Sequence, residues 1–225
     1  MATSNVDVKD ERIAGIASSI RVIPDFPKPG IMFQDVTTLL LDPKAFKDTI
    51  DLFVERYRDK NINVIAGIEA RGFIFGPPIA LAIGAKFVPM RKPKKLPGEV
   101  ISEEYSLEYG TDKIEMHVGA VQAGERAVIV DDLIATGGTL NAAIRLLERV
   151  GVTVVECACV IELAELKLAS LFCEFGLPYT LNITSPRLAT VSSYQISLKD
   201  REGTLSFGKF MMVGRNWATN HCLFL

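Results

Sequence analysis

The stretch that most constrains the fold of this chain runs from Ala127 to Thr139. Its first four residues, Ala-Val-Ile-Val, are typical of a strand that is buried on both faces. Two adjacent carboxylates, Asp131 and Asp132, follow where this strand is expected to end. A loop of five small residues comes next: Ala135, Thr136, Gly137, Gly138 and Thr139. A helical pattern then places four apolar residues on one face: Leu140, Ile144, Leu147 and Val150.

Each part of this strand-loop-helix stretch has a chemical reason. A loop of small residues lets backbone N–H groups approach an anion closely, and the following helix adds its positive dipole end. The carboxylates repel a phosphate but accept hydrogen bonds from sugar hydroxyls. The alternative is a capped helix after a buried strand, with Asp131 and Asp132 only solvated, but such a turn needs one capping residue rather than an acidic pair. The stretch also differs from a P-loop, because the P-loop lysine is absent. Taken together, the small-residue loop and the acidic pair predict a site for a ribose 5-phosphate.

Further strand patterns alternate with helical ones along the chain. Residues 64–68 have the pattern of a buried parallel strand, and residues 86–90 and 152–163 are predicted as further strands. Asp42-Pro43 is a strong helix start, and the apolar stripe after it continues to about Arg58. This alternation predicts an α/β fold with a mostly parallel, doubly wound sheet and helices on both faces.

Composition limits the classes of function. A length of 225 residues suits one domain, or one domain and a tail, and the net charge of −2 gives no reason to expect a nucleic-acid partner. No apolar run reaches membrane-spanning length, and the acidic N-terminal residues do not resemble a signal or transit peptide. We therefore expect a cytoplasmic protein without a membrane partner. The cysteines fit no zinc spacing and are expected to be reduced core thiols: Cys157, Cys159, Cys173 and Cys222.

Two segments outside the central stretch carry candidate ligand contacts. Three prolines and a glycine within residues 24–30 make a stiff loop, and Phe33 follows it. This segment is either a linker with an anchoring aromatic residue or a rigid lid that stacks Phe33 on a flat heterocycle. Arg71 follows the strand at 64–68, where it either pairs with Glu69 on the surface or meets an anionic leaving group.

A basic, proline-rich segment at residues 91–98 comes after the strand at 86–90, with a possible hairpin up to about residue 118. Most such runs are solvated charged loops. Here a mobile cationic arm would suit a reaction that neutralises a diphosphate and excludes water. Glu103 and Glu104 in the hairpin are expected to be solvated.

These motifs resemble those of a known family. Residues 131–139 look like the phosphoribosyl-pyrophosphate (PRPP) motif of type I phosphoribosyltransferases, which transferases for several bases share. Residues 21–37 are similar to the base-binding hood of adenine phosphoribosyltransferases, and Leu107-Glu108-Tyr109-Gly110 matches their flexible catalytic loop. The resemblance runs from about Arg12 to Lys167 and is particularly close to the plant enzymes.

The resemblance implies an activity and a role for each matched residue. The enzyme would join adenine to the 5-phosphoribosyl group of PRPP, giving AMP and pyrophosphate, in purine salvage. Catalytic roles fall to Glu108 as acid/base, with Tyr109 as its loop partner, and to Arg71, Asp131 and Asp132. PRPP would also contact the small-residue loop, Arg91 and Lys95. Adenine would contact Met32, Phe33, Gln34 and Leu133.

The same resemblance implies Mg²⁺, held mainly through PRPP, so that no protein metal ligand is named. In the family, a lysine matching Lys95 reaches a neighbouring subunit, which implies a homodimer. Residues 168–225 depart from the family pattern, so we expect a phosphoribosyltransferase domain at 1–167 and a divergent tail. The alternatives are a catalytically impaired isoform and a PRPP-binding regulatory protein.

Overall fold

The computed structural model of the chain describes residues 11–106, 110–134, 137–162, 197–199 and 205–207. The chain divides into two compact units, residues 1–185 and 186–225. Within the second unit, β9 (Ser197–Lys199) and β10 (Leu205–Phe207) form a two-stranded antiparallel sheet. The predicted boundary after Lys167 lies outside the described residues and stays a prediction.

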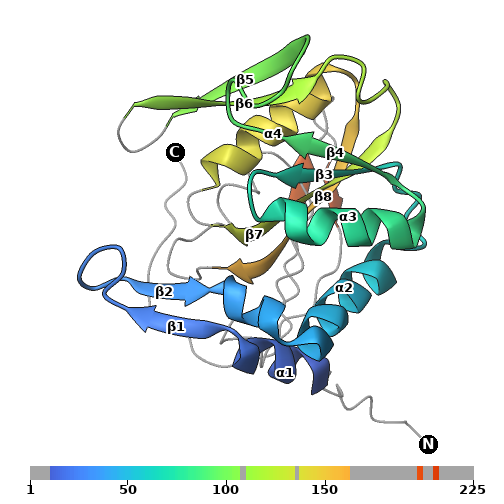
Figure 1. The fold of residues 1–225 in the computed structure, drawn as a ribbon. Helices are drawn as coiled ribbons and strands as arrows, with labels where there is room; N and C mark the ends of the chain where they lie inside the picture. The colour runs from blue at the N-terminus through green and yellow to red at the C-terminus, as the bar shows by residue number, and fades with distance from the viewer. Residues whose placement is uncertain (1–10, 107–109, 135–136, 163–196, 200–204, 208–225) are drawn as a thin grey trace, which may run out of the picture. The chain divides into compact units, whose positions relative to one another are not determined.

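The first unit is built on a four-stranded parallel sheet with the order β4-β3-β7-β8. Its strands are β3 (Val64–Ile68), β4 (Lys86–Met90), β7 (Arg126–Ile134) and β8 (Thr153–Glu162). The helices are α1 (Glu11–Ser19), α2 (Pro43–Tyr57), α3 (Gly72–Ile83) and α4 (Gly138–Arg149). The alternation of strands and helices in Figure 1 confirms the predicted α/β class.

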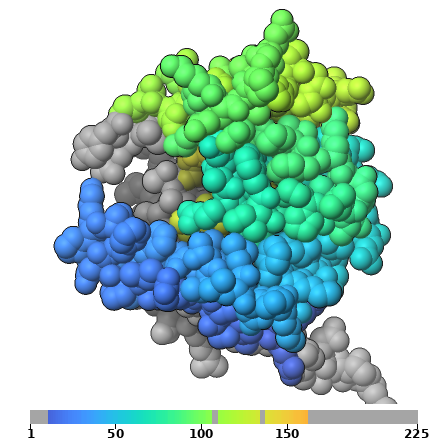
Figure 2. All heavy atoms as spheres, in the orientation of Figure 1, coloured from blue at the N-terminus to red at the C-terminus, as the bar shows by residue number. Residues whose placement is uncertain are grey.

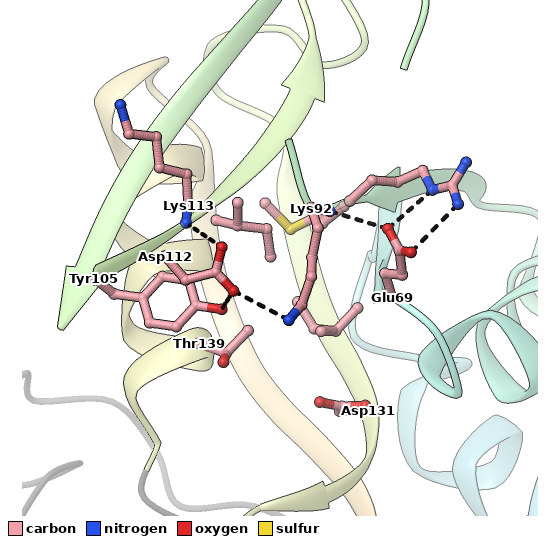
Figure 3. A pocket seen from close by; sticks show the side chains of 11 residues that line it. Glu69, Lys92, Tyr105, Asp112, Lys113, Asp131 and Thr139 are labelled. Atoms are coloured by element: carbon pink, nitrogen blue, oxygen red, sulfur yellow. Dashed lines mark hydrogen bonds and ion pairs between the residues drawn. The ribbon is translucent and has the colours of Figure 1, made fainter. Parts of the chain in front are cut away.

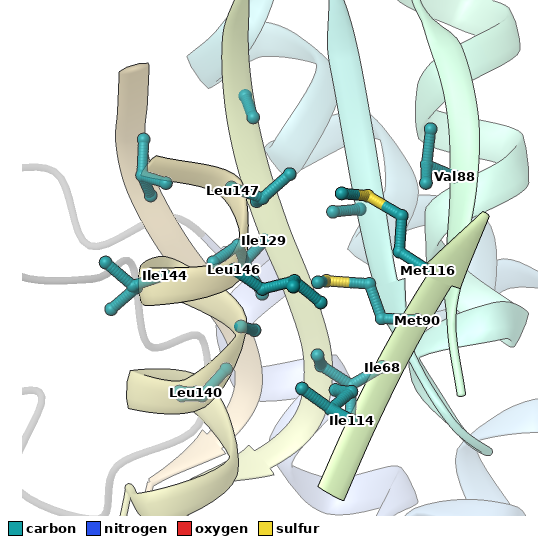
Figure 4. Packing of buried hydrophobic residues seen from close by; sticks show 14 of the residues in the cluster. Ile68, Val88, Met90, Ile114, Met116, Ile129, Leu140, Ile144, Leu146 and Leu147 are labelled. Carbon is teal, nitrogen blue, oxygen red and sulfur yellow. The ribbon is translucent and has the colours of Figure 1, made fainter. Parts of the chain in front are cut away.

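Each face of the sheet buries its own hydrophobic core, as the alternation of side chains along a strand requires. On one face, Ala66 and Ile129 pack with Leu146 of α4 and with Met116 (Figure 4). Met116 belongs to the antiparallel hairpin of β5 (Val100–Ser106) and β6 (Thr111–His117). On the other face, neighbouring residues such as Ile65 and Val128 pack with α1, α2 and α3. Helices therefore cover both faces, as predicted.

Local sequence explains where the helices begin and end. The Asp42 carboxylate accepts hydrogen bonds from the Lys44 and Ala45 N–H groups at 2.9 and 3.1 Å, and Pro43 opens α2. This confirms the predicted cap. Helix α4 begins after Gly137 and ends before Gly151, and both glycines have positive φ angles of 76° and 81°. Glycine takes this left-handed conformation without the steric cost of a Cβ atom.

Strand β7 is longer than predicted, because the acidic pair lies inside it. Pairing with β3 stops at Val130, opposite Gly67, whereas pairing with β8 continues to Ile134. The expectation that the strand ends at Asp131 was therefore wrong for one of its two edges. Beyond Val130 the strand keeps one neighbour, so the acidic pair has an extended backbone and an open side.

The N-terminal segment forms a hairpin followed by a short 3-10 helix. Strands β1 (Arg21–Pro24) and β2 (Met32–Asp35) pair antiparallel, and η1 (Val36–Leu41) follows. The proline-rich turn is closed by a hydrogen bond of 2.7 Å from the Gly30 N–H to the Asp25 carboxylate. In Figure 2 this blue segment and the green β5–β6 hairpin lie on opposite sides of the teal residues around α3 and β4.

Candidate active site

The candidate site lies at the carboxyl ends of β3 and β7. The chain leaves β3 through α3 on one face of the sheet and leaves β7 through α4 on the other face. Adjacent strands whose connections diverge in this way leave a crevice between them, where open α/β sheets bind their ligands. The turn after β3 carries Glu69 and Arg71, and the end of β7 carries Asp131 and Asp132.

Arg71 and Asp132 meet across this crevice. The Arg71 Nε atom lies 2.9 Å from the Asp132 carboxylate, which is almost fully buried. Gly72 permits the approach, because a Cβ atom there would lie 2.4 Å from the Val130 carbonyl oxygen. The alternative partner considered for Arg71 from sequence was Glu69. The structure instead pairs Glu69 with Arg91, at 3.1 Å.

Asp131 lines a cavity beside this ion pair (Figure 3). Its carboxylate accepts a hydrogen bond of 2.8 Å from the Asp132 N–H. Burial, together with the negative charge of Asp132, raises the pKa of Asp131 well above its ordinary value. A group in this position gains from a bound hydrogen-bond donor, such as a sugar hydroxyl, which stabilises the charged carboxylate.

The cavity has a volume of about 210 Å³. Pockets for whole drug-sized ligands are larger, roughly 300–1,000 Å³, so this cavity suits one part of a ligand, such as a diphosphate. Its polar lining is rich in paired charges. The lining residues are Ile68, Glu69, Met90, Arg91, Lys92, Tyr105, Asp112, Lys113, Ile114, Asp131 and Thr139.

The two cations from the segment after β4 that line the cavity each pair with a carboxylate. Arg91 Nε lies 3.1 Å from the Glu69 carboxylate, which also accepts a bond of 3.0 Å from the Lys92 N–H. Burial opposes ionisation of Glu69, but these two donors outweigh it and lower its pKa. The Lys92 ammonium lies 3.1 Å from the Asp112 carboxylate. To bind Arg91 or Lys92, an anion that enters the cavity must therefore replace the carboxylate with which that cation is paired.

Of the predicted PRPP contacts, the structure brings Arg71, Arg91, Asp131, Asp132 and Thr139 together around this crevice. Gly137 and Gly138 lie at the start of α4, next to Thr139. Lys95 has an exposed side chain, and its carbonyl oxygen accepts a hydrogen bond of 3.2 Å from Arg91. Ala135, Thr136, Glu108 and Tyr109 lie outside the described residues.

The predicted adenine contacts lie elsewhere and are not among the residues that line this cavity. Met32, Phe33 and Gln34 belong to β2. The Met32 side chain is exposed, and the Phe33 ring packs edge-on against Phe26, with ring centroids 5.0 Å apart. Leu133 packs against the core beneath α1, α2 and α3.

Sequence reasoning included Lys92 only as part of the basic segment 91–98, and it did not predict four other polar residues of the cavity: Glu69, Tyr105, Asp112 and Lys113. The register of the β5–β6 hairpin could have found two of them, because a turn around Gly110 places Tyr105 opposite Asp112. The expectation that Glu103 is solvated was wrong. Arg149 at the end of α4 donates to the Glu103 carboxylate at 2.6 Å and so fastens the hairpin to that helix. Cys157 and Cys159 both lie in the core, as predicted, and Cys157 is a free thiol.

The donor set around the crevice also bears on the expected metal ion. Among the described residues, no three carboxylate, thiolate or imidazole groups come close enough to hold a metal. The expected magnesium ion, held mainly through substrate oxygens, therefore stays a prediction. None of the helices in the described part of the chain is long and apolar enough to cross a membrane.

Comparison with known families identifies the class of protein. The family model described as "phosphoribosyl transferase domain" matches residues 35–180, in agreement with the parallel sheet and the acidic pair at its crevice. Among curated proteins, adenine phosphoribosyltransferase 1, chloroplastic, of Arabidopsis thaliana is 84% identical over 167 residues, which are 74% of this chain and 68% of the relative. The chain belongs to the adenine phosphoribosyltransferase family.

Other relatives and solved structures agree. Adenine phosphoribosyltransferase 3 of Arabidopsis thaliana is 79% identical over 73% of this chain and 90% of that protein. The crystal structure of the Saccharomyces cerevisiae enzyme, complexed with an imino-altritol bisphosphate and adenine, is 37% identical, with a TM-score of 0.72. The match covers 78% of this chain and 99% of the yeast chain.

Proposed function

We propose that this chain is an adenine phosphoribosyltransferase that joins the 5-phosphoribosyl group of PRPP to N9 of adenine. The products are AMP and pyrophosphate, and the pathway is purine salvage. The observation that carries this proposal is the crevice at the ends of β3 and β7, where Arg71 pairs with Asp132 beside Asp131. The high identity to plant enzymes of that name favours this activity over an impaired isoform or a PRPP-binding regulator.

The ribose phosphate would occupy the end of β7 and the start of α4. The 5-phosphate would bind the loop at 135–139, where backbone N–H groups and the helix dipole favour an anion. Asp131 and Asp132 would accept hydrogen bonds from the ribose hydroxyls. These hydroxyls would stabilise the charged form of Asp131, whose pKa is raised by burial and by the negative charge of Asp132.

The diphosphate would lie on the other side of the crevice, near Arg71, Arg91 and Lys95. Arg71 is partly exposed, so its guanidinium can offer its remaining N–H groups to the leaving group. When bound, Mg²⁺ would neutralise part of the diphosphate charge while diphosphate oxygens and water hold it. The protein residues hold and orient the leaving group.

Adenine would stack on Phe33, with Met32, Gln34 and Leu133 around it. As the N9–C1 bond forms, the bond from C1 to the diphosphate oxygen breaks, and its electron pair leaves with pyrophosphate. Glu108 would take the proton that adenine loses, with Tyr109 beside it on the loop. The protein contributes positioning, charge neutralisation and exclusion of water.

The test is AMP formation by the full chain from adenine, PRPP and Mg²⁺, with guanine, hypoxanthine and orotate assayed in parallel. Among the four bases, we expect only adenine to give a nucleotide product. If the enzyme converted another base instead, that base would be assigned as the substrate in place of adenine. A folded protein that binds PRPP but makes no nucleotide would support the regulator or the impaired isoform instead.

We further propose a homodimer in the cytoplasm. The exposed Lys95 side chain supports the first part, since in this family the matching lysine reaches a neighbouring subunit. The buried free thiol of Cys157 supports a reducing compartment. Light scattering of the purified chain tests the dimer. A fluorescent fusion tests the compartment, and its appearance in plastids would overturn the cytoplasmic assignment.

A further inference from the structure

Asp112 occupies a place in the cavity that the proposed reaction does not yet explain. It is the second residue of β6, and its carboxylate points into the cavity toward the Lys92 ammonium (Figure 3). Three groups donate to it: Lys92 Nζ at 3.1 Å, the Tyr105 hydroxyl at 3.2 Å and the Lys113 N–H at 2.8 Å. The protein therefore places a carboxylate of its own in a cavity that is suited to the diphosphate of a ligand.

The ionisation of this cluster agrees with its geometry. The Lys113 N–H, followed by the contacts with Lys92 and Tyr105, lowers the pKa of Asp112. The hydrogen bond to Asp112 raises the pKa of Lys92. Both groups are thus charged at neutral pH, and the ammonium is held by a full negative charge.

Asp112 also connects two parts of the site. Lys92 belongs to the basic segment after β4, and Tyr105 stands opposite Asp112 in the hairpin. Thr139, in the first turn of α4, lines the same cavity as these residues. The carboxylate thus joins a cation of the diphosphate side to the hairpin, in a cavity that also reaches the phosphate side.

We propose that Asp112 is a positioning residue that holds Lys92 in the free site and gives it up to the diphosphate of PRPP. This inference rests on the proposed function. The Lys92–Asp112 pair is partly open to water, so it is weak and easily exchanged. A magnesium diphosphate offers Lys92 several oxygens, and Asp112 keeps its bonds from Tyr105 and the Lys113 N–H after the exchange.

The exchange has a measurable consequence. In the free protein Asp112 competes with the diphosphate for Lys92, so removing its charge should strengthen diphosphate binding. Asp112→Asn removes the charge and keeps one oxygen, which can accept from the Tyr105 hydroxyl, while the NH2 group that replaces the other oxygen no longer accepts from the Lys113 N–H. We expect its affinity for pyrophosphate to rise about two- to fivefold, which is the range of one partly exposed ion pair.

The experiment is calorimetric titration of the full chain with magnesium pyrophosphate. The matched control is Glu104→Gln, which removes one negative charge from the neighbouring cross-strand pair of the same hairpin, where Glu104 and Lys113 are both half-exposed. We expect Asp112→Asn to bind more tightly than this control. In a Lys92→Met background the gain from Asp112→Asn should disappear.

Each outcome decides something different. Weaker binding by Asp112→Asn, or the same binding as Glu104→Gln, would overturn the exchange and leave Asp112 as a structural residue. A gain that persists without Lys92 would assign the effect to general charge and would also overturn it. If the wild-type chain bound no pyrophosphate and made no AMP, the proposed function would fail first, together with the inference.

Discussion

The Arg71 guanidinium and the Asp132 carboxylate form an ion pair, with Nε and Oδ2 2.9 Å apart. The pair joins the turn after β3 to the end of β7, across the crevice between the two strands. Sequence reasoning predicted these residues separately, one for a leaving group and one for sugar hydroxyls. Because the two side chains are in contact, the leaving group and the sugar of a phosphoribosyl donor would both bind to this one ion pair.

Gly72 holds this unit together, and its replacement should separate it. A Cβ atom on Gly72 would lie 2.4 Å from the Val130 carbonyl oxygen, so Gly72→Ala must push the start of α3 away from β7. We expect a loss of about 1–3 kcal/mol in the free energy of unfolding and a fall of about tenfold in kcat/KM for PRPP, since a misplacement of this kind is costly in catalysis. Urea denaturation and steady-state kinetics measure the two effects.

The control for Gly72 is Gly15 in α1, where an added Cβ atom meets nothing within 4 Å. Gly15→Ala should leave kinetics unchanged and stabilise the helix by about 0.5–1 kcal/mol. Wild-type stability and kcat/KM in Gly72→Ala would show that the close approach of α3 to β7 is not needed.

Asp131 should make the protein less stable at neutral pH than an uncharged residue would. Burial and the charge of Asp132 raise its pKa in the folded state. The folded protein therefore binds more protons than the unfolded chain between the ordinary pKa near 3.8 and the raised value, and stability falls as pH rises through that window. Above this pH window the free energy of unfolding is lowered by the full amount, about 1.4 kcal/mol for each unit of pKa shift.

Asp131→Asn avoids this loss, so its Tm should exceed that of the wild type at neutral pH, by about 2–4 °C for each kcal/mol. The gain should vanish as pH falls toward 3.8. The same variant should use PRPP poorly, because the amide is a weaker acceptor for ribose hydroxyls. Calorimetry across pH measures the first effect, with Asp51→Asn, a partly exposed carboxylate of α2, as control. An unchanged Tm at every pH would contradict the prediction.

Much of the fold followed from local sequence, because the signals were local. The Asp42-Pro43 start, the apolar stripe of α4, the buried run at 64–68 and the strand pattern at 86–90 needed no distant partner to be recognised. The extent of β7 could not be predicted in this way. Strand β8 supports it to Ile134 after β3 has ended, and this support exists only in the assembled sheet.

The candidate site divides in the same manner. Arg71, Asp131 and Asp132 were predicted because a strand end and small neighbours mark them in the sequence. Asp112 and Tyr105 carry no such mark. Tyr105 donates to Asp112, and the contact of Asp112 with Lys92 depends on how the hairpin packs on α4, to which the unexpected pair of Arg149 and Glu103 contributes.

A buried carboxylate away from the crevice should control stability without affecting catalysis. Glu156 on β8 is 2% exposed and accepts hydrogen bonds from Arg56 Nε at 2.7 Å and Lys60 Nζ at 3.1 Å, while both cations stay partly exposed. Arg56→Met leaves the carboxylate buried with one partner, at a cost of about 3 kcal/mol. Glu156→Gln keeps an acceptor and lets both cations reach water, so it should cost about 1 kcal/mol.

Chemical denaturation measures whether Arg56→Met loses more stability than Glu156→Gln. The AMP assay should give the wild-type kcat for the folded fraction of each variant. Equal losses of stability would show that Glu156 is not effectively desolvated. A fall in kcat without a fall in stability would connect Glu156 to the reaction, contrary to its position in the first half of β8.

Phe33 should affect adenine use and leave PRPP use almost unchanged. Its ring is held edge-on against Phe26, and it lies on β2, apart from the charged cavity. Stacking of a base on an aromatic ring is worth about 1–3 kcal/mol, so Phe33→Ala should raise KM for adenine about 5- to 150-fold. Phe33→Leu keeps an apolar side chain but loses the flat ring, so it should recover only part of this loss. Leu41→Ala removes an exposed apolar side chain from the adjoining η1 and serves as the control. Equal increases in KM for adenine and PRPP would mean that Phe33 supports the hood rather than the base.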